Sequence, residues 1–213
     1  MEKKEISRAV IKRLPRYYRY LGDLKAQGVE RISSGDLSSL MKVTASQIRQ
    51  DLNNFGGFGQ QGYGYNVNYL FNEIGKILGL DCKNNMIVVG VGNMGTALIK
   101  YSSFRSYGCD IIGAFDTNIN LIGKTINGIV VQDYSEVGHF IKEHNVDIAV
   151  LTVPKEAAGH IAEELVKYGI KGFWNFAYTD LRLGPGIVVE NVHLSDSLLR
   201  LSYSMKSKGV VND

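Results

Sequence analysis

Three glycines with the spacing Gly-x-Gly-x-x-Gly, Gly90, Gly92 and Gly95, stand between an apolar run and a helical pattern. Such a turn lets the backbone approach a pyrophosphate, whose charge is bound by the free N–H groups at the start of the following helix. Asp116 follows about 20 residues later, where a carboxylate accepts hydrogen bonds from ribose hydroxyls and repels a 2′-phosphate. The combination predicts a dinucleotide site that prefers NAD(H) to NADP(H), formed by Gly90, Val91, Gly92, Asn93, Met94, Gly95 and Asp116.

The tripeptide Thr152-Val153-Pro154 ends a later apolar run. Ligands of open parallel sheets bind beyond the carboxyl ends of the strands. Two interpretations stay open for these three residues. They line the nicotinamide half of the site, or they only terminate the strand.

No catalytic constellation accompanies the nucleotide motif. A nucleotide-binding fold accounts for residues 85–191, which leaves no substrate domain. Tyr168 and Lys171 lack the Tyr-x-x-x-Lys spacing of a proton relay, and the four histidines form no recognisable acid–base pair. The histidines and the two cysteines also lack the spacing of metal ligands. We therefore expect no catalytic residue and no metal, and a protein that senses NADH and NAD.

Two short helices joined by a brief turn are predicted at residues 37–41 and 45–54, with Ile48 and Leu52 facing inward. This arrangement is typical of a helix-turn-helix, whose second helix fits the major groove of DNA. Arg can pair with guanine and Gln with adenine, although a solvated polar face is the competing interpretation for each residue. The candidate base contacts on the outward side are Ser46, Gln47, Arg49 and Gln50.

The next eleven residues, 55–65, hold five glycines and four aromatic residues. A flexible linker is one interpretation, but interleaved aromatics favour a glycine-tipped β-hairpin, the wing of a winged-helix domain. Its candidates for entering a narrow minor groove are Gln60, Gln61, Gly62 and Tyr63, where glycine allows close approach of the backbone. Phosphate contacts are expected from basic side chains outside the hairpin, namely Lys12, Arg13, Arg16 and Lys42.

Charge divides unevenly along the chain. Residues 1–80 carry twelve Lys and Arg against seven Asp and Glu, a net charge of +5, whereas residues 81–213 carry twelve against fourteen, a net charge of −2. A basic domain that faces a polyanion accounts for such asymmetry. The chain has no apolar run of membrane length and no signal-peptide pattern, so we expect a cytoplasmic protein.

Local signals place the N-terminal helices. A helical period covers residues 6–26, within which Pro15 predicts a kink or two successive helices. Ser33 or Ser34 is the predicted N-cap of the first short helix, and Thr44 that of the second.

Three segments make up the predicted architecture. Residues 1–80 form the winged-helix domain, which ends near residues 79–84. From Met86 the pattern alternates between Val/Ile-rich strands and amphipathic helices, which predicts a Rossmann-like domain with a doubly wound parallel sheet at residues 81–192. A last amphipathic helix and tail occupy residues 193–213.

The chain resembles the Rex family of redox-sensing repressors over nearly its whole length. The resemblance rests on the runs RLPRYYRYL, RISSGDLSSLMKVTASQIRQDLNNFG, GYGYNV, VGVGNMGTAL, AFD, LTVP and GIKGFWNFA. It implies a homodimer whose C-terminal helices are swapped between the nucleotide domains. It further implies a palindromic operator in double-stranded DNA that is bound with NAD and released with NADH. Operators of fermentation, NADH-reoxidation and respiration genes are the typical targets.

The resemblance also implies roles for individual residues. Arg49 and Gln50 match contacts of the recognition helix, and residues 61–63 match the wing tip. Arg19 and Tyr101 match a polar bridge that couples the nucleotide state to closure of the dimer.

The chain departs from the family at several of these positions. A basic residue is frequent where Gln50 and Gln61 stand, and proline is frequent at the position of Tyr178. The swapped helix often begins with Asp, whereas here it begins with His193. Three alternatives follow: the bridging carboxylate is absent, Asp196 substitutes one turn later, or His193 makes the coupling depend on pH.

Two other functions compete with a sensor. One is an NAD- or CoA-binding enzyme or carrier module whose N-terminal domain serves assembly. The other is a DNA-binding protein whose nucleotide fold binds no NADH. Turnover of small alcohols, aldehydes or acids would support the first, and failure to bind NADH would support the second.

Overall fold

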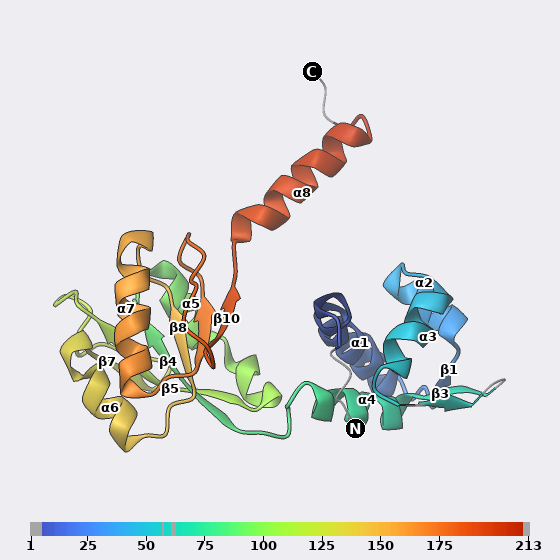
Figure 1. The fold of residues 1–213 in the computed structure, drawn as a ribbon, viewed down its shortest axis with the longest axis horizontal. Coiled ribbons are helices and arrows are strands. Elements are labelled where there is room, and N and C mark those ends of the chain that lie inside the picture. Colours follow the sequence, from blue (N-terminus) through green and yellow to red (C-terminus); the bar gives the residue numbers. More distant parts are fainter. Residues whose placement is uncertain (1–5, 57, 61–62, 211–213) are drawn as a thin grey trace. The chain divides into compact units, whose positions relative to one another are not determined.

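A computed structural model describes residues 6–56, 58–60 and 63–210 of the 213-residue chain. The chain divides into two compact units, Met1–Cys82 and Lys83–Asp213, called here the first and the second unit (Figure 1). Within the described ranges no helix is both long enough and apolar enough to cross a membrane.

The helices of the first unit begin at polar caps. They are α1 (Arg8–Ala26), α2 (Ser34–Met41), α3 (Ala45–Asn53) and α4 (Val67–Ile77). At each start a side-chain oxygen accepts a backbone N–H bond that the helix itself leaves unpaired. The residues that do so are Ser7, Ser33, Thr44 and Asn66.

Two of these starts confirm the sequence-based N-caps, Ser33 and Thr44. The helix-turn-helix is also confirmed, because α2 and α3 are separated only by Lys42, Val43 and Thr44. Pro15 lies inside α1, which is a single helix, so the alternative of two successive helices was wrong.

One apolar core joins the four helices. The residues facing it recur at helical spacing, and burying such a side chain stabilises a fold by roughly 1.5–3 kcal/mol. Ile48 and Leu52 face inward as predicted. The buried members are Leu14, Tyr17, Leu21, Ile32, Leu37, Met41, Ile48, Leu52, Tyr65, Val67, Leu70 and Ile74.

The predicted hairpin is present as part of a small antiparallel sheet. It consists of β2 (Gly59–Gln60) and β3 (Gly64–Asn66). A further strand, β1 (Arg31–Ile32), pairs with β3, so the order is β1-β3-β2. Gly64 has a φ of +67°, and a Cβ there would lie 2.6 Å from the carbonyl oxygen of Ile32. The sheet therefore requires glycine at this position.

The second unit contains the predicted parallel sheet. Its order is β10-β9-β8-β4-β5-β7-β6, and each pairing is parallel except that of β6 with β7. The chain first runs outward from β4 in one direction and then returns to β8 on the other side, as in doubly wound folds. The strands are β4 (Asn84–Val89), β5 (Cys109–Asp116), β6 (Thr125–Ile126), β7 (Ile129–Asp133), β8 (Ile148–Leu151), β9 (Gly172–Asn175) and β10 (Val188–Asn191).

Helices cover both faces of this sheet (Figure 1). α6 (Val137–Glu143) and α7 (Lys155–Tyr168) pack on the face of Ile87 and Val89. α5 (Asn93–Lys100) packs on the opposite face. Alternate residues of β4 thus enter different apolar clusters, as expected for a strand buried on both faces.

The last helix, α8 (Leu194–Ser207), extends away from the sheet of its own unit (Figure 1). None of its side chains is buried. Its large apolar side chains are exposed: Leu194, Leu198, Leu199, Leu201, Tyr203 and Met205.

Candidate functional site

The glycine turn between β4 and α5 is shaped by close packing. Gly90 has a φ of +90°, and a Cβ there would lie 2.8 Å from the carbonyl oxygen of Thr152. A Cβ on Gly95 would collide with the carbonyl oxygen of Gly90. Beside Gly92, in contrast, the described residues place no heavy atom within 4 Å of a Cβ position, chain neighbours aside. The fold itself requires Gly90 and Gly95, whereas Gly92 keeps open surface at the turn.

α5 begins at this open surface. The N-cap of α5 is Gly92, which has no side chain to cap the helix, and the first turn of α5 carries no acidic residue. The first N–H groups of a helix have no partner within the helix, and the helix dipole adds partial positive charge there. Asn93 is exposed and Met94 is half-buried in this first turn. The turn can therefore bind an anionic group such as a pyrophosphate.

Asp116 is the last residue of β5, next to the turn. Its Oδ2 accepts a hydrogen bond from the backbone N–H of Val91 at 2.6 Å, and its Oδ1 accepts one from Asn118 N at 2.8 Å. A carboxylate accepts about four hydrogen bonds, so capacity remains for ribose hydroxyls. Val91 itself is buried, so it reaches the site through its backbone.

A pocket of about 460 Å³ lies at the carboxyl edge of the sheet. Thr152, Val153 and Pro154 line it together with Gly90 and Asp116. Leu121, Tyr134 and Ile161 also line the pocket and were not predicted. For Tyr134 a signal was present, because it directly follows β7 and so lies at this edge. The lining is Val89, Gly90, Gly92, Phe115, Asp116, Thr117, Asn118, Leu121, Tyr134, Thr152, Val153, Pro154, Ala157 and Ile161.

Thr152 has a second role in the turn. Its Oγ1 donates to the carbonyl oxygen of Gly90, and β8 ends one residue earlier, at Leu151. Thr152 therefore both follows the strand and fixes the glycine turn. An open glycine edge, an uncapped helix start and a carboxylate on one pocket fit an adenine dinucleotide.

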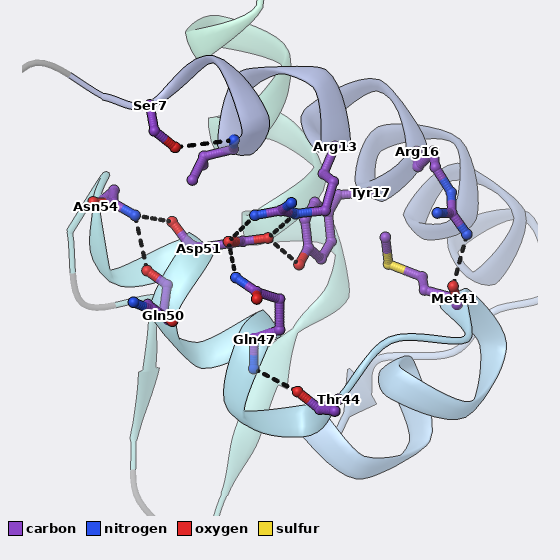
Figure 2. Close-up of polar contacts among 11 residues, drawn as sticks. Ser7, Arg13, Arg16, Tyr17, Met41, Thr44, Gln47, Gln50, Asp51 and Asn54 are labelled. Atoms are coloured by element: carbon purple, nitrogen blue, oxygen red, sulfur yellow. Dashed lines mark hydrogen bonds and ion pairs between the residues drawn. The ribbon is translucent and has the colours of Figure 1, made fainter.

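The outward face of α3 carries most of the candidate base contacts. Ser46, Arg49 and Gln50 are exposed, and Arg49 Nη1 donates to Ser34 Oγ at 3.0 Å. Gln47 differs from the expectation. Its Nε2 donates to Asp51 Oδ1 at 2.8 Å, so its amide is held within the unit (Figure 2).

Two of the four expected phosphate contacts also have partners inside the first unit. Arg13 donates from Nε and Nη2 to the carboxylate of Asp51, both at 2.7 Å. Arg16 Nη2 donates to the carbonyl oxygen of Met41 at 2.7 Å, near the end of α2 (Figure 2). Lys12 and Lys42 remain exposed. The alternation of polar and apolar residues along α1 cannot distinguish an arginine that faces DNA from one that pairs internally.

The wing is described only in part. Gln61 and Gly62 lie outside the described residues. Tyr63 is 68% exposed, and Arg31 of β1 donates from Nη1 to its carbonyl oxygen at 3.3 Å. The Arg31 guanidinium also lies 5.9 Å from the Tyr63 ring centroid, within the range of cation–π attraction. Arg31 thus supports the wing, a role that the sequence analysis missed.

The residues matched to the coupling bridge lie in different parts of the chain. Arg19 of α1 is exposed. Tyr101, 53% exposed, follows α5, and its ring lies 4.8 Å from that of Phe104. His193 precedes α8, and its Nε2 lies 2.8 Å from Asp180 Oδ1. Asp180 is therefore a carboxylate partner that the sequence did not suggest, whereas Asp196 is exposed in the first turn of α8.

Comparisons with known proteins agree with the division of the chain into two units. The family model described as "CoA binding domain" matches residues 81–179, and the one described as "Putative DNA-binding protein N-terminus" matches residues 5–53. The redox-sensing transcriptional repressor Rex of Clostridioides difficile is 56% identical over 203 residues, 95% of this chain and 97% of its own.

Solved structures give the same result. The crystal structure of RSP in complex with β-NAD+ and operator DNA has a TM-score of 0.91 and 51% identity, covering 97% of this chain and 95% of RSP. RSP in complex with β-NADH has a TM-score of 0.90 and 48% identity, covering 96% of each chain. Identities of this size over almost the whole length show that the chain belongs to the Rex family of redox-sensing transcriptional repressors.

Proposed function

We propose that this chain is a homodimeric repressor that binds a palindromic operator and releases it when NADH binds. A similar repressor, RSP, has been crystallised with β-NAD+ and operator DNA and with β-NADH. The Rex family consists of transcriptional repressors rather than enzymes, and this chain binds nicotinamide dinucleotides as signals. Its site of action is the cytoplasm.

One observation carries this proposal. A single chain combines a helix with exposed base-reading side chains and a pocket that joins Gly92, Asp116 and the start of α5. An enzyme or carrier module would need the pocket but not the exposed face of α3. Residues 1–80 act as the DNA-binding domain, residues 81–192 as the nucleotide domain and residues 193–213 as the dimerisation segment.

The homodimer is supported by α8. A helix with this many exposed Leu side chains buries them against another surface in the assembled protein. A second copy gives each protomer the same contact and places two recognition helices on the two halves of a palindrome.

The DNA contacts follow from exposure. Ser46, Arg49 and Gln50 read bases, Tyr63 acts with Gln61 and Gly62 at the wing tip, and Lys12 and Lys42 contact phosphates. Arg19, Tyr101, His193 and Asp196 couple the nucleotide state to the dimer.

The test is a mobility-shift titration with a duplex that the wild-type protein selects from a random pool. NADH replaces NAD+ stepwise at constant total dinucleotide. We expect operator binding to fall with the fraction of NADH, because the released form must bind NADH more tightly than the DNA-bound form does. Operator affinity that neither dinucleotide alters would contradict the proposal.

A further inference from the structure

A fully buried carboxylate lies in the recognition helix. Asp51 of α3 has 0% of its surface exposed, on the same inward side as Ile48 and Leu52. An isolated charge in an apolar core is strongly unfavourable, so such a group persists only with partners. Asp51 has three.

The partners of Asp51 come from α1 and from its own helix (Figure 2). Arg13 makes two parallel hydrogen bonds to the carboxylate, both at 2.7 Å. The hydroxyl of Tyr17 donates to Oδ2 at 2.9 Å, and Gln47 Nε2 donates to Oδ1 at 2.8 Å. The carboxylate thus accepts four hydrogen bonds, which is about its full capacity.

Charge is retained at this site. Burial raises the pKa of Asp51, but the hydrogen bonds from Arg13, Gln47 and Tyr17 outweigh it and hold the pKa below its ordinary value. Burial and the bond to Asp51 raise the pKa of Tyr17. At neutral pH the cluster is therefore a carboxylate, a guanidinium and a neutral phenol.

The geometry of this cluster fixes more than the distance between two helices. A guanidinium fork on both oxygens of a carboxylate permits one relative orientation, unlike an apolar contact, which tolerates sliding and rotation. Asp51 stands one residue after Gln50 and two after Arg49, and each residue of a helix turns it by about 100°. Fixing the rotation of α3 at Asp51 therefore fixes the direction in which Arg49 and Gln50 point.

We propose that Asp51 is a positioning residue for operator recognition. Its ion pair with Arg13 sets the rotation of α3 against α1 and keeps the Gln47 amide away from the bases. The network determines discrimination among DNA sequences rather than the attraction to phosphates. This inference rests on the proposed function, since it assigns part of the operator specificity of the same helix.

Asp51→Asn in the full-length protein tests the proposal. An amide cannot accept the guanidinium fork, while the variant gains one unit of positive charge. We expect affinity for the selected operator to fall by about 10- to 100-fold. Affinity for a random duplex of equal length should stay equal or rise by up to about threefold, because phosphate attraction increases. Fluorescence anisotropy with both duplexes at one salt concentration measures the two affinities.

Glu73→Gln is the matched control. Glu73 lies on α4 and pairs with Lys76 at 2.8 Å in a solvent-accessible ion pair, so its substitution removes the same charge outside the network. Both affinities should shift together and leave their ratio unchanged. Arg13→Lys keeps the charge of Arg13 but removes the fork, and it should lower the operator-to-random ratio as Asp51→Asn does.

The opposite movement of the two affinities separates positioning from general effects. Loss of folded protein lowers both affinities in proportion, and a pure charge effect raises both. Either pattern in Asp51→Asn and in Arg13→Lys would overturn the proposal. NADH affinity should stay at the wild-type value in each variant, since the pocket lies in the second unit. Failure of the wild-type protein to select a duplex would instead refute the proposed function.

Discussion

Gly92→Ala should separate nucleotide binding from folding. Gly92 has φ −68° and ψ −161°, a backbone conformation open to any residue, and space surrounds its Cβ position. Alanine loses less conformational entropy than glycine on folding, so stability should stay equal or rise by about 0.4–1 kcal/mol. The added methyl group occupies the surface that a pyrophosphate must approach. NADH affinity should fall at least about tenfold, which corresponds to about 1.4 kcal/mol.

Gly95→Ala is the contrasting variant. Its Cβ would collide with the carbonyl oxygen of Gly90 and lie 2.9 Å from Thr152 Oγ1. Because a backbone atom yields little, we expect destabilisation by about 1–3 kcal/mol. The displaced turn should also bind NADH less tightly.

Trp174 allows the unfolding of the second unit to be followed separately. It is the only tryptophan of the chain and lies in β9 of the second unit. Denaturant unfolding followed by its fluorescence gives the stability of that unit, and calorimetry gives NADH affinity. If Gly92→Ala bound NADH as tightly as the wild type, the pyrophosphate would not pass over this glycine. A loss of stability above about 1 kcal/mol in Gly92→Ala would contradict the conclusion that a Cβ at this position meets no neighbouring atom.

Four further changes test other parts of the account. Asp116→Ala should weaken NADH binding and reduce discrimination against NADPH, and unchanged calorimetric affinities for both would refute the ribose contact. Arg49→Ala should cost about 1–3 kcal/mol on the operator and little on random DNA, whereas equal losses in anisotropy would make it a phosphate contact. Leu201→Glu, on the exposed face of α8, should shift the protein to monomer in sedimentation, and an intact dimer would exclude this face. The lowered pKa of Asp51 contributes stability above the ordinary carboxyl pKa of about 4 that is lost as the pH falls through the folded-state value. Asp51→Asn should therefore flatten acid unfolding followed by circular dichroism below about pH 5, where an unfolded-state carboxyl group begins to bind protons, and an unchanged slope would show that Asp51 contributes nothing to it.

The elements with strong local signals were predictable from the sequence. Thr44 precedes a helical period and caps α3, and the strand–helix alternation after Met86 identifies the doubly wound sheet. Two strands were missed, β1 and β6, each of two residues. A pair of residues has no measurable period, and its pairing depends on a distant partner.

The direction of polar side chains was less predictable. Arg13, Arg16 and Gln47 carry the composition of a DNA-binding surface, yet their partners are Asp51 and a helix-end carbonyl. One signal was present: Asp51 stands on the inward side of α3, between Ile48 and Leu52. A carboxylate at that position requires a cationic partner, and identifying it as Arg13 requires the packing of α1 against α3.

The dinucleotide pocket was predictable at its glycine turn but not at its far wall. Motif spacing encodes Gly90, Gly92 and Asp116. Tyr134 and Ile161, in contrast, reach the pocket because β7 ends at the carboxyl edge of the sheet and α7 follows β8 there. Side chains contributed by neighbouring crossovers leave no local pattern.

Affinity and sensing must come from different ends of this pocket. NADH and NAD+ have the same adenosine and pyrophosphate, so Gly92, the start of α5 and Asp116 bind both alike. Equal affinity shifts no equilibrium, and a hundredfold preference requires about 2.7 kcal/mol from the nicotinamide ring alone. The ring loses its positive charge on reduction, and an apolar surrounding disfavours the charged form more than the neutral one. The residues that contact the adenosine and the pyrophosphate are therefore expected to contribute equally to the affinity for both forms, and the discrimination that drives release must come from the residues that contact the nicotinamide ring.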